Sequence, residues 1–291
     1  MRYQFIKDHQ GLFAIETMCG VLEVSSSGYY QWRQYPLSER KKENIQLVEQ
    51  ITQVHQLSRQ TYGSPRIHAE LKAQGIKCAE NPVARLMKNH GIRAKTKKKY
   101  VVTTDSAHAF PIAENRLNQQ FEAQAPNEKW VADIPYIWTQ QGWLYLAVVL
   151  DLFSGRVVGW SMQASLGKGL VIAALTRAIK ARQPPVGLLH PSDRGSQYAS
   201  KEYRGVLQKM GIQCSMSRKG NCYDNSARES FFATLKPERV DDQVYPSRQD
   251  ARLDSFHYIE TWYNRKRRHS TLNYFSPEQY ENNYHKLLLV A

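Results

Sequence analysis

The chain has 291 residues, 42% of them hydrophobic, which is enough for a sizeable core in one large or two to three small domains. Forty Lys and Arg residues against 26 Asp and Glu residues give a formal charge of +14, which predicts a polyanionic partner. No apolar run approaches the ~20 residues of a membrane span, and the first ten residues lack the apolar core of a signal peptide, so we expect a soluble, intracellular protein.

Residues 1–92 contain short helical patterns and predict an all-α region of the helix-turn-helix type. In MCGVLEVSSSGYYQW, a helix breaks near Glu23 and Ser25 can cap a short second helix, which is the layout of a helix-turn-helix. Small bundles that bind nothing show the same pattern, so DNA contact is a hypothesis at this stage. The expected helices lie around 13–24, from 38 to about 56, and over 65–73 and 80–89.

Residues 93–128 contain RAKTKKK, two prolines and little periodicity, and we interpret them as a basic linker. Lys97, Lys98 and Lys99 in this linker are predicted to contact DNA phosphates. Arg66 lies next to Pro65, which marks a helix start, and we assign it the same role.

From Trp130 onward the pattern changes to strands. WVADIPYIW, WLYLAVVLD and RVVGWSM predict a three-stranded meander, with Trp130, Trp138, Trp143 and Trp160 in the core. A helix over 167–181, the strand VGLLH, a helix over 200–210, the strand IQCSMS and a helix from 225 follow. This order predicts an RNase H-like α/β domain over 129–291, with a mixed five-stranded sheet flanked by helices and a basic helical extension at its C-terminal end.

Three carboxylates on separate elements of this domain predict a metal site: Asp133 in the first strand, Asp193 after the fourth, and Glu229 on the last core helix. Two carboxylates ~4 Å apart repel by roughly 4 kcal/mol unless cations neutralise them. Ligand sets made only of oxygen select Mg²⁺ or Mn²⁺, and two such ions are suited to in-line phosphoryl transfer. The alternative is that each acid is merely solvated or caps a helix.

The helix that carries Glu229 has a polar line along one side. Asn225 and Lys236 fall within about 40° of Glu229 on the helix surface, whereas Leu235 faces the core. Lys236 is about 10 Å from Glu229 along the axis, which is too far for a shared metal and well suited to a DNA phosphate. We therefore predict that Asn225 and Lys236 contact DNA, with an ordinary solvated lysine as the alternative.

A second basic cluster, RKRRH, occupies residues 265–269. We interpret it as a phosphate-binding patch in which Arg267 and Arg268 contact DNA. His269 is expected to belong to this patch and not to act as a general base.

Several segments resemble one family, the second reading frame of the insertion-sequence-three group of bacterial transposases. They are WVADIPYIWT, DLFSGRVVGW, PSDRGSQYAS, DNSARESFFATLKPE and YNRKRRHSTLNYFSPEQY, and YGSPRI extends the resemblance into the helical half. This group belongs to the superfamily of DDE transposases and retroviral integrases. The resemblance, which includes 35 residues between Asp193 and Glu229 (229 − 193 − 1), implies the catalytic triad Asp133, Asp193 and Glu229, with Lys236 as the accompanying basic residue.

The resemblance also implies a reaction, partners and a location in the bacterial cytoplasm, associated with the nucleoid. The reaction is metal-dependent cleavage at the ends of a mobile element followed by strand transfer, with two Mg²⁺ or Mn²⁺ ions per active site. The expected partners are double-stranded DNA, as terminal inverted repeats and as target, further copies of the chain, and the protein of an upstream reading frame. Zinc is not implied, because nothing here matches the His/His/Cys/Cys module of retroviral integrases.

Two other functions fit parts of the sequence. One is a non-catalytic DNA-binding regulator on a transposase scaffold, which the three intact acids disfavour. The other is an RNase H-like nuclease, which the large basic N-terminal region disfavours. Metal-dependent nicking distinguishes the first from a transposase, and strand transfer distinguishes the second.

Overall fold

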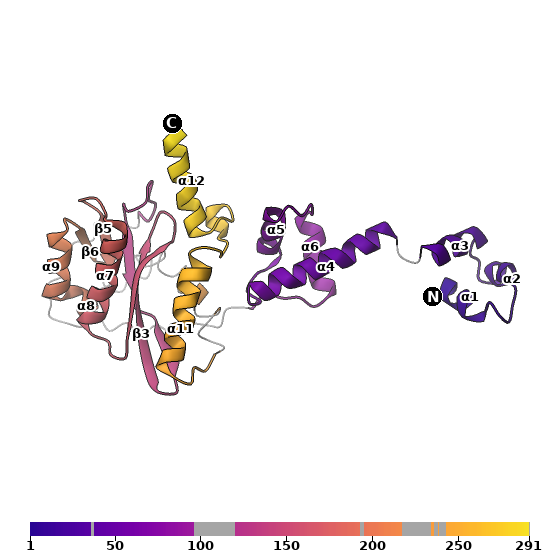
Figure 1. The fold of residues 1–291 in the computed structure, drawn as a ribbon, viewed down its shortest axis with the longest axis horizontal. Helices are drawn as coiled ribbons and strands as arrows, with labels where there is room; N and C mark the ends of the chain where they lie inside the picture. The colour runs from indigo at the N-terminus through magenta and orange to yellow at the C-terminus, as the bar shows by residue number, and fades with distance from the viewer. Residues whose placement is uncertain are drawn as a thin grey trace.

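The computed structural model describes the chain in three parts that follow one another in sequence: a group of short helices, a second helical group, and a sheet covered by helices (Figure 1). Within the described residues, no helix is long and apolar enough to cross a membrane. The residues described are 1–35, 38–95, 120–192, 195–216, 234–235, 238 and 243–290.

The first part has a hydrophobic core of its own, formed by Ile6, Met18, Cys19 and Tyr29. The predicted helix break is confirmed: α2 ends at Val21, and Glu23 adopts a positive φ of 53°. The hydroxyl of Ser25 then accepts a hydrogen bond from the Gly28 N–H at 3.0 Å and caps α3. The helices are α1 (Arg2–His9), α2 (Ile15–Val21) and α3 (Ser26–Gln34).

The second part, which we call the central helical unit, comprises α4 (Glu39–Leu57), α5 (Ser64–Ala73) and α6 (Glu80–Asn89). Its bounds lie within two residues of the predicted helices, and Pro65 occupies the first turn of α5. A separate hydrophobic cluster that includes Ile51, Tyr62, Ile67 and Leu86 holds it together. The predicted region 1–92 therefore contains two small cores, one for each group of helices.

The predicted linker has ordered contacts at both ends. His55 Nε2 lies 3.1 Å from the carbonyl oxygen of Arg93, which ties residues 93–95 to the central helical unit. Lys129 Nζ donates to the Gln120 carbonyl at 2.8 Å at the other end. Residues 96–119, with Lys97, Lys98 and Lys99, lie outside the described residues, and the linker remains a prediction there.

The first predicted strand forms as two pieces in one register. Asp133 lies opposite Val148 and Tyr136 opposite Tyr145, so both pieces pair antiparallel with the strand over 142–151 without a shift in register. Pro135 interrupts the pairing because it has no N–H to donate. The strands of the meander are β1 (Trp130–Asp133), β2 (Tyr136–Thr139), β3 (Gly142–Asp151) and β4 (Val157–Gln163).

Two parallel strands, β5 (Leu189–Ser192) and β6 (Gln213–Met216), complete the sheet beside β1. Lys129 and Leu189 form a parallel bridge, and the Leu189 N–H donates to the Glu128 carbonyl at 2.9 Å. With β1 and β2 counted as the two pieces of one strand, the strand order is therefore β4-β3-β1-β5-β6. This mixed five-stranded sheet confirms the predicted RNase H-like fold, with the first and fourth predicted strands as neighbours.

Helices cover both faces of the sheet (Figure 1). On one face lie α7 (Lys168–Arg182), α8 (Ser196–Ala199) and α9 (Lys201–Lys209). The close packing of α7 on β4 needs Gly159, since a Cβ there would lie 2.4 Å from the Ala174 carbonyl oxygen. On the other face lie α11 (Arg248–His257) and a π-helical turn, η3 (Tyr258–Tyr263).

Buried ion pairs attach the last helix, α12 (Pro277–Val290), which follows the short turn η4 (Ser270–Leu272). Glu281 accepts hydrogen bonds from Arg182 at 2.8 Å and Arg156 at 2.9 Å. Asp151 lies 3.6 Å from Arg182 and accepts the Asn127 N–H at 2.7 Å, although burial raises the pKa of its carboxyl to about 6. These contacts give Asp151 a structural role at the end of β3.

Of the four tryptophans predicted to lie in the core, two pack there and two are exposed. Trp130 is fully buried and Trp160 packs partly buried against the core. The prediction is wrong for Trp138 and Trp143, which are 51% and 45% exposed. They lie opposite each other near the β2–β3 turn with ring centroids 4.8 Å apart, so they stabilise the hairpin as a cross-strand pair.

Candidate active site

Asp133 occupies the end of β1, just before the break at Pro135. Its Oδ1 accepts a hydrogen bond from the Ile134 N–H at 2.8 Å, which fixes the carboxylate near the main chain. Because side chains alternate along a strand, Asp133 shares its face of the sheet with Val131, which packs in the same hydrophobic cluster as Leu235. The carboxylate therefore lies on the face that receives the helix predicted to carry Glu229.

The register between β1 and β5 bears on the second carboxylate. Lys129 bridges Leu189 in parallel, and His190 Nδ1 lies 2.9 Å from the Trp130 carbonyl oxygen, so both contacts join residues 60 apart (189 − 129 and 190 − 130). Asp193 follows the last residue of β5, and it also lies 60 positions after Asp133 (193 − 133). Asp193 itself lies outside the described residues.

Leu235 is one of the described residues of the predicted catalytic helix, together with Thr234 and Glu238. It is helical and 1% exposed, which confirms the prediction that its side of the helix faces the core. Glu229, Asn225 and Lys236 lie outside the described residues. Among the residues that are described, no three His, Cys, Asp or Glu side chains gather closely enough to hold a metal ion.

His190 has a structural role beside this site. It is fully buried, and its Nε2 lies 2.6 Å from the Tyr203 hydroxyl, while its Nδ1 faces the Trp130 carbonyl. The ring thus ties β5 to β1 and to α9. Both ring nitrogens contact polar groups of the protein, so the role of His190 is structural.

The structure corrects the prediction that Arg267 contacts DNA. Its guanidinium is 1% exposed and donates to both carboxylate oxygens of Glu238 at 2.6 to 3.0 Å. Burial alone would lower the pKa of Arg267, but the charge and hydrogen bonds of Glu238 hold it above its usual value. Arg267 is therefore a buried ion-pair partner with no surface to offer a phosphate.

Arg268 and His269 are corrected in the same way. Arg268 Nε donates to Glu70 on α5 at 2.5 Å, its Nη1 donates to the Tyr274 carbonyl at 2.9 Å, and its side chain is 12% exposed. Burial, reinforced by the nearby Arg267, lowers the pKa of His269 to about 2, so this ring is neutral and gives no charge to a phosphate patch. Sequence offered no signal for these roles, because Glu238 and Glu70 lie 29 and 198 residues away.

Arg66 lies near the same group. Its guanidinium sits over the Tyr62 ring, 5.8 Å from the centroid. Burial and the nearby Arg267 lower the pKa of Arg66. A phosphate contact of Arg66 stays a prediction.

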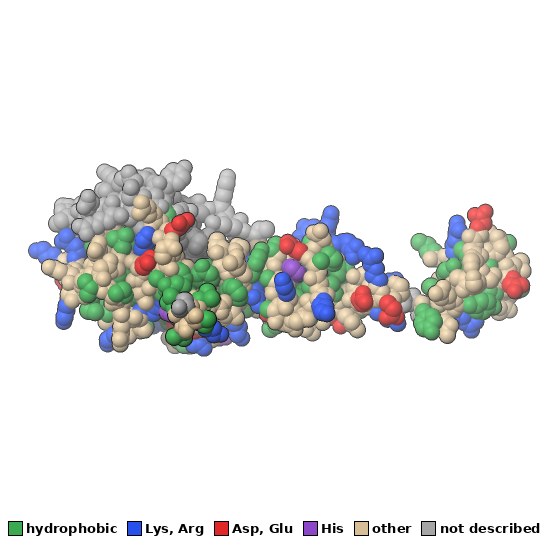
Figure 2. Space-filling model, turned by 90° about the horizontal axis from the view of Figure 1, so that it is seen from above, with side chains coloured by type: hydrophobic (Ala, Val, Ile, Leu, Met, Phe, Trp, Pro, Cys, Tyr) green, Lys and Arg blue, Asp and Glu red, His purple; other side chains and the backbone are tan. Residues whose placement is uncertain are grey.

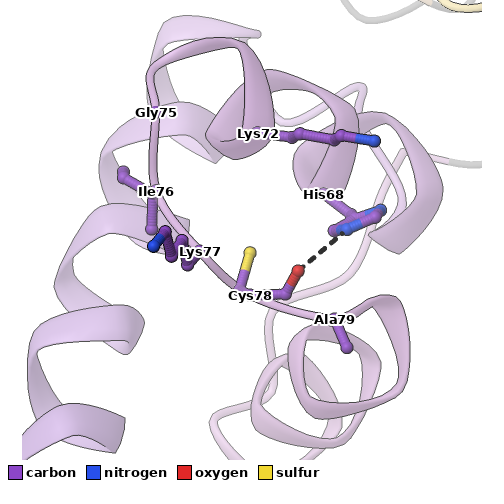
Figure 3. A pocket seen from close by; sticks show the side chains of 7 residues that line it. All are labelled: His68, Lys72, Gly75, Ile76, Lys77, Cys78 and Ala79. Carbon is purple, nitrogen blue, oxygen red and sulfur yellow. Dashed lines mark hydrogen bonds between the residues drawn. The ribbon is translucent and has the colours of Figure 1, made fainter.

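A pocket of about 600 Å³ opens at the turn between α5 and α6, far from Asp133 in the chain (Figure 3). His68 Nε2 lies 3.2 Å from the Cys78 carbonyl oxygen and closes one side of it. Burial raises the pKa of the Cys78 thiol, so this cysteine is a poor nucleophile. Lys72 and Lys77 give the pocket a positive rim suited to a phosphate and not to catalysis.

Exposed basic side chains lie on all three parts of the chain, and several lie near one another on the central helical unit (Figure 2). On this unit they come from the start of α4, from both sides of the α5–α6 turn, and from α6. They are Arg40, Lys41, Lys42, Lys72, Lys77, Arg85 and Lys88.

Comparisons with known proteins match both halves of the chain. The family model of an HTH-like domain matches residues 41–100, and two models of the integrase core domain match residues 123–222 and 210–277. An uncharacterized 31 kDa protein of insertion element IS600 from Shigella sonnei is 44% identical over 270 residues, covering 93% of this chain and 99% of that protein. Transposase InsF for insertion sequence IS3A from Escherichia coli K12 is 43% identical over 284 residues, covering 97% and 99%.

Solved structures of two viral proteins are also similar. A chain of the simian T-cell lymphotropic virus intasome, in complex with PP2A regulatory subunit B56 gamma, covers 79% of this chain and 74% of its own at 16% identity, with a TM-score of 0.46. The HTLV-2 integrase catalytic core domain in complex with magnesium covers 55% and 99% at 18% identity, with a TM-score of 0.41.

Proposed function

Because the chain belongs to the IS3 family of insertion-sequence transposases, we propose that it cleaves the ends of its element and joins them to target DNA with Asp133, Asp193 and Glu229 as catalytic carboxylates. The observation that carries this assignment is the parallel register of β1 and β5. If the offset of 60 continued by one residue past Ser192, Asp193 would lie beside Asp133.

The donor set of this site contains only carboxylate oxygens, which fits a hard divalent cation. Asp133, Asp193 and Glu229 would hold two Mg²⁺ or Mn²⁺ ions, which supply activation of the attacking hydroxyl and stabilisation of the leaving oxygen. Asp133 contributes a rigid oxygen, because its strand pairs with β3 and its Oδ1 is held by the Ile134 N–H.

The central helical unit would recognise the element ends, as its match to an HTH-like domain favours. The exposed basic side chains of this unit, together with Lys97, Lys98 and Lys99 beyond it, would bind duplex phosphates. We further propose that the chain acts as a homo-oligomer on DNA in the cytoplasm, and that the protein of an upstream reading frame is a partner.

Strand transfer by the full chain tests the proposed function. The chain should join a duplex that carries the element end to a plasmid in Mg²⁺ or Mn²⁺, and should fail in EDTA and in Ca²⁺, whose looser coordination positions the nucleophile poorly. Joined products are resolved on a gel. Nicking without joining would favour the RNase H-like nuclease, and end binding without metal-dependent nicking would favour the regulator.

Lys236 is proposed to contact a phosphate near the scissile bond without touching the metal ions. Lys236→Ala should therefore lower the slope of log affinity against log salt for an end duplex by about one unit, since one phosphate contact is lost. Salt-titrated binding of wild type and variant measures this slope, and metal affinity should stay the same. An unchanged slope together with unchanged activity would make Lys236 an ordinary solvated lysine.

A further inference from the structure

Two adjacent arginines, Arg267 and Arg268, reach into different parts of the protein. Arg267 binds Glu238, which follows Glu229 by nine residues (238 − 229), whereas Arg268 binds Glu70 on α5 of the central helical unit. We propose that this arginine pair is a positioning device that couples occupation of the central helical unit by an element end to Glu238 and the packed Leu235 near it, which follow Glu229 in the chain. The inference rests on the proposed function and adds to it the route by which end recognition reaches the active site.

The Arg267 side of the device is buried and its donors and acceptors are paired. Glu238 is 8% exposed and accepts both the Arg267 bonds and a hydrogen bond from the Tyr258 hydroxyl at 2.9 Å. A carboxylate held on two sides in this way has little freedom to shift. Leu235, three residues before Glu238, packs in the core with Tyr258 and so fixes the same segment from a second point.

The Arg268 side connects to the central helical unit by main chain and side chain. The Arg268 N–H donates to the Tyr62 hydroxyl at 2.8 Å, and its guanidinium binds Glu70. Trp262 packs against the hydrophobic clusters of both the sheet and the central helical unit. A further ion pair, Arg59 with Asp254 at 3.4 Å, joins the end of α4 to α11.

Consecutive Cα atoms are only about 3.8 Å apart, so a displacement of the main chain at Arg268 also displaces the main chain at Arg267. A shift of α5 on binding DNA would pull on Glu70, and thus on Arg268, next to the residue that holds Glu238. The Glu70 contact is partly exposed, with 28% of the Glu70 side chain accessible, whereas the Glu238 contact is closed. The geometry thus has an enclosed side at Glu238 and a partly exposed side at Glu70.

The test compares Glu70→Gln with Glu49→Gln in the full chain. Both variants remove one negative charge from the central helical unit, but Glu49 is an exposed residue of α4 outside this contact. Strand transfer is measured with an end duplex and with a scrambled duplex. Glu70→Gln should lower the ratio of the two rates by about tenfold, within the usual range for coupling between sites. Metal-dependent nicking of random plasmid should stay within about twofold of wild type, as should every rate of Glu49→Gln.

A double-mutant cycle with Arg268→Gln then tests whether the two residues act as a pair. The doubly substituted chain should lose no more end preference than the more affected single variant, because either change breaks the same contact. Additive losses, or an end preference of Glu70→Gln equal to wild type, would overturn the inference. A parallel fall in end preference, random nicking and thermal stability would also overturn it, since a purely structural role predicts that result. Failure of the proposed function is seen separately, as a wild-type chain without metal-dependent strand transfer.

Discussion

Asp133→Asn is expected to reduce strand transfer by at least about 100-fold. Loss of a group that only supports a metal ligand lowers activity by up to about 100-fold, and loss of a ligand itself should have at least that effect. The change keeps the size of the side chain and removes the charge that an ion requires. The Ile134 N–H can still donate to the remaining carbonyl oxygen, so the strand should be preserved. Strand transfer is measured with an end duplex in Mn²⁺, together with binding of that duplex, which should be unchanged. Asp193→Asn should behave in the same way.

Asp151→Asn is the matched control, because Asp151 is also an acid at the end of a strand of this sheet but is buried among Arg182, Asn127 and Trp130. It should lower thermal stability and leave the metal requirement intact. Mn²⁺ should raise the melting temperature of wild type and of Asp151→Asn but not of Asp133→Asn, since an ion that binds only the folded state stabilises it. Undiminished strand transfer by Asp133→Asn would refute the assignment.

Arg267→Ala is expected to destabilise the chain by about 3–5 kcal/mol, because it leaves the buried Glu238 carboxylate without its cation. Urea unfolding followed by tryptophan fluorescence measures this change, and Trp262 lies near the affected segment. Arg267→Met should cost less than the alanine change, because it refills the volume. The contrast between the two variants separates the contribution of packing from that of the charge.

Lys266→Ala is the control from the same basic run. Lys266 is exposed, so this substitution should change the free energy of unfolding by less than about 0.5 kcal/mol. A similar small change for Arg267→Ala would contradict the structural role of Arg267. DNA affinity at low salt gives a second comparison, because the loss of an exposed charge lowers it and the loss of a buried, paired charge does so only through unfolding.

The local elements of the fold could be predicted from the sequence. Pro65 at a helix start, the Ser25 cap and the apolar run of β3 each act over a few residues, so their meaning is carried by neighbours in the chain. The order of strands and helices also limited the topology, because few arrangements bury such a series. Helix α1 was missed, since among its residues only Ile6 is buried and the segment has no clear apolar face.

The fate of individual side chains in two places was decided by tertiary structure. RKRRH is a uniform run of basic residues in sequence, yet Arg265 and Lys266 are exposed whereas Arg267 is enclosed with Glu238. Trp138 and Trp143 are large apolar residues of the kind found in cores, but they lie exposed at the end of a hairpin. Burial of the arginine depends on a partner many residues away in the chain. Exposure of the two tryptophans depends on where the covering helices end.

Sequence by itself thus predicted most of the helical and extended segments apart from α1, and it predicts that three acids stand on elements an RNase H-like sheet can bring together. Tertiary structure decided which charges reach solvent. The reason is physical: secondary structure follows from contacts between near neighbours in the chain. A charged side chain loses its hydration when it is buried, and it is stable there only if an opposite charge from another part of the chain pairs with it. For Arg267 that charge is Glu238, and for Arg268 it is Glu70.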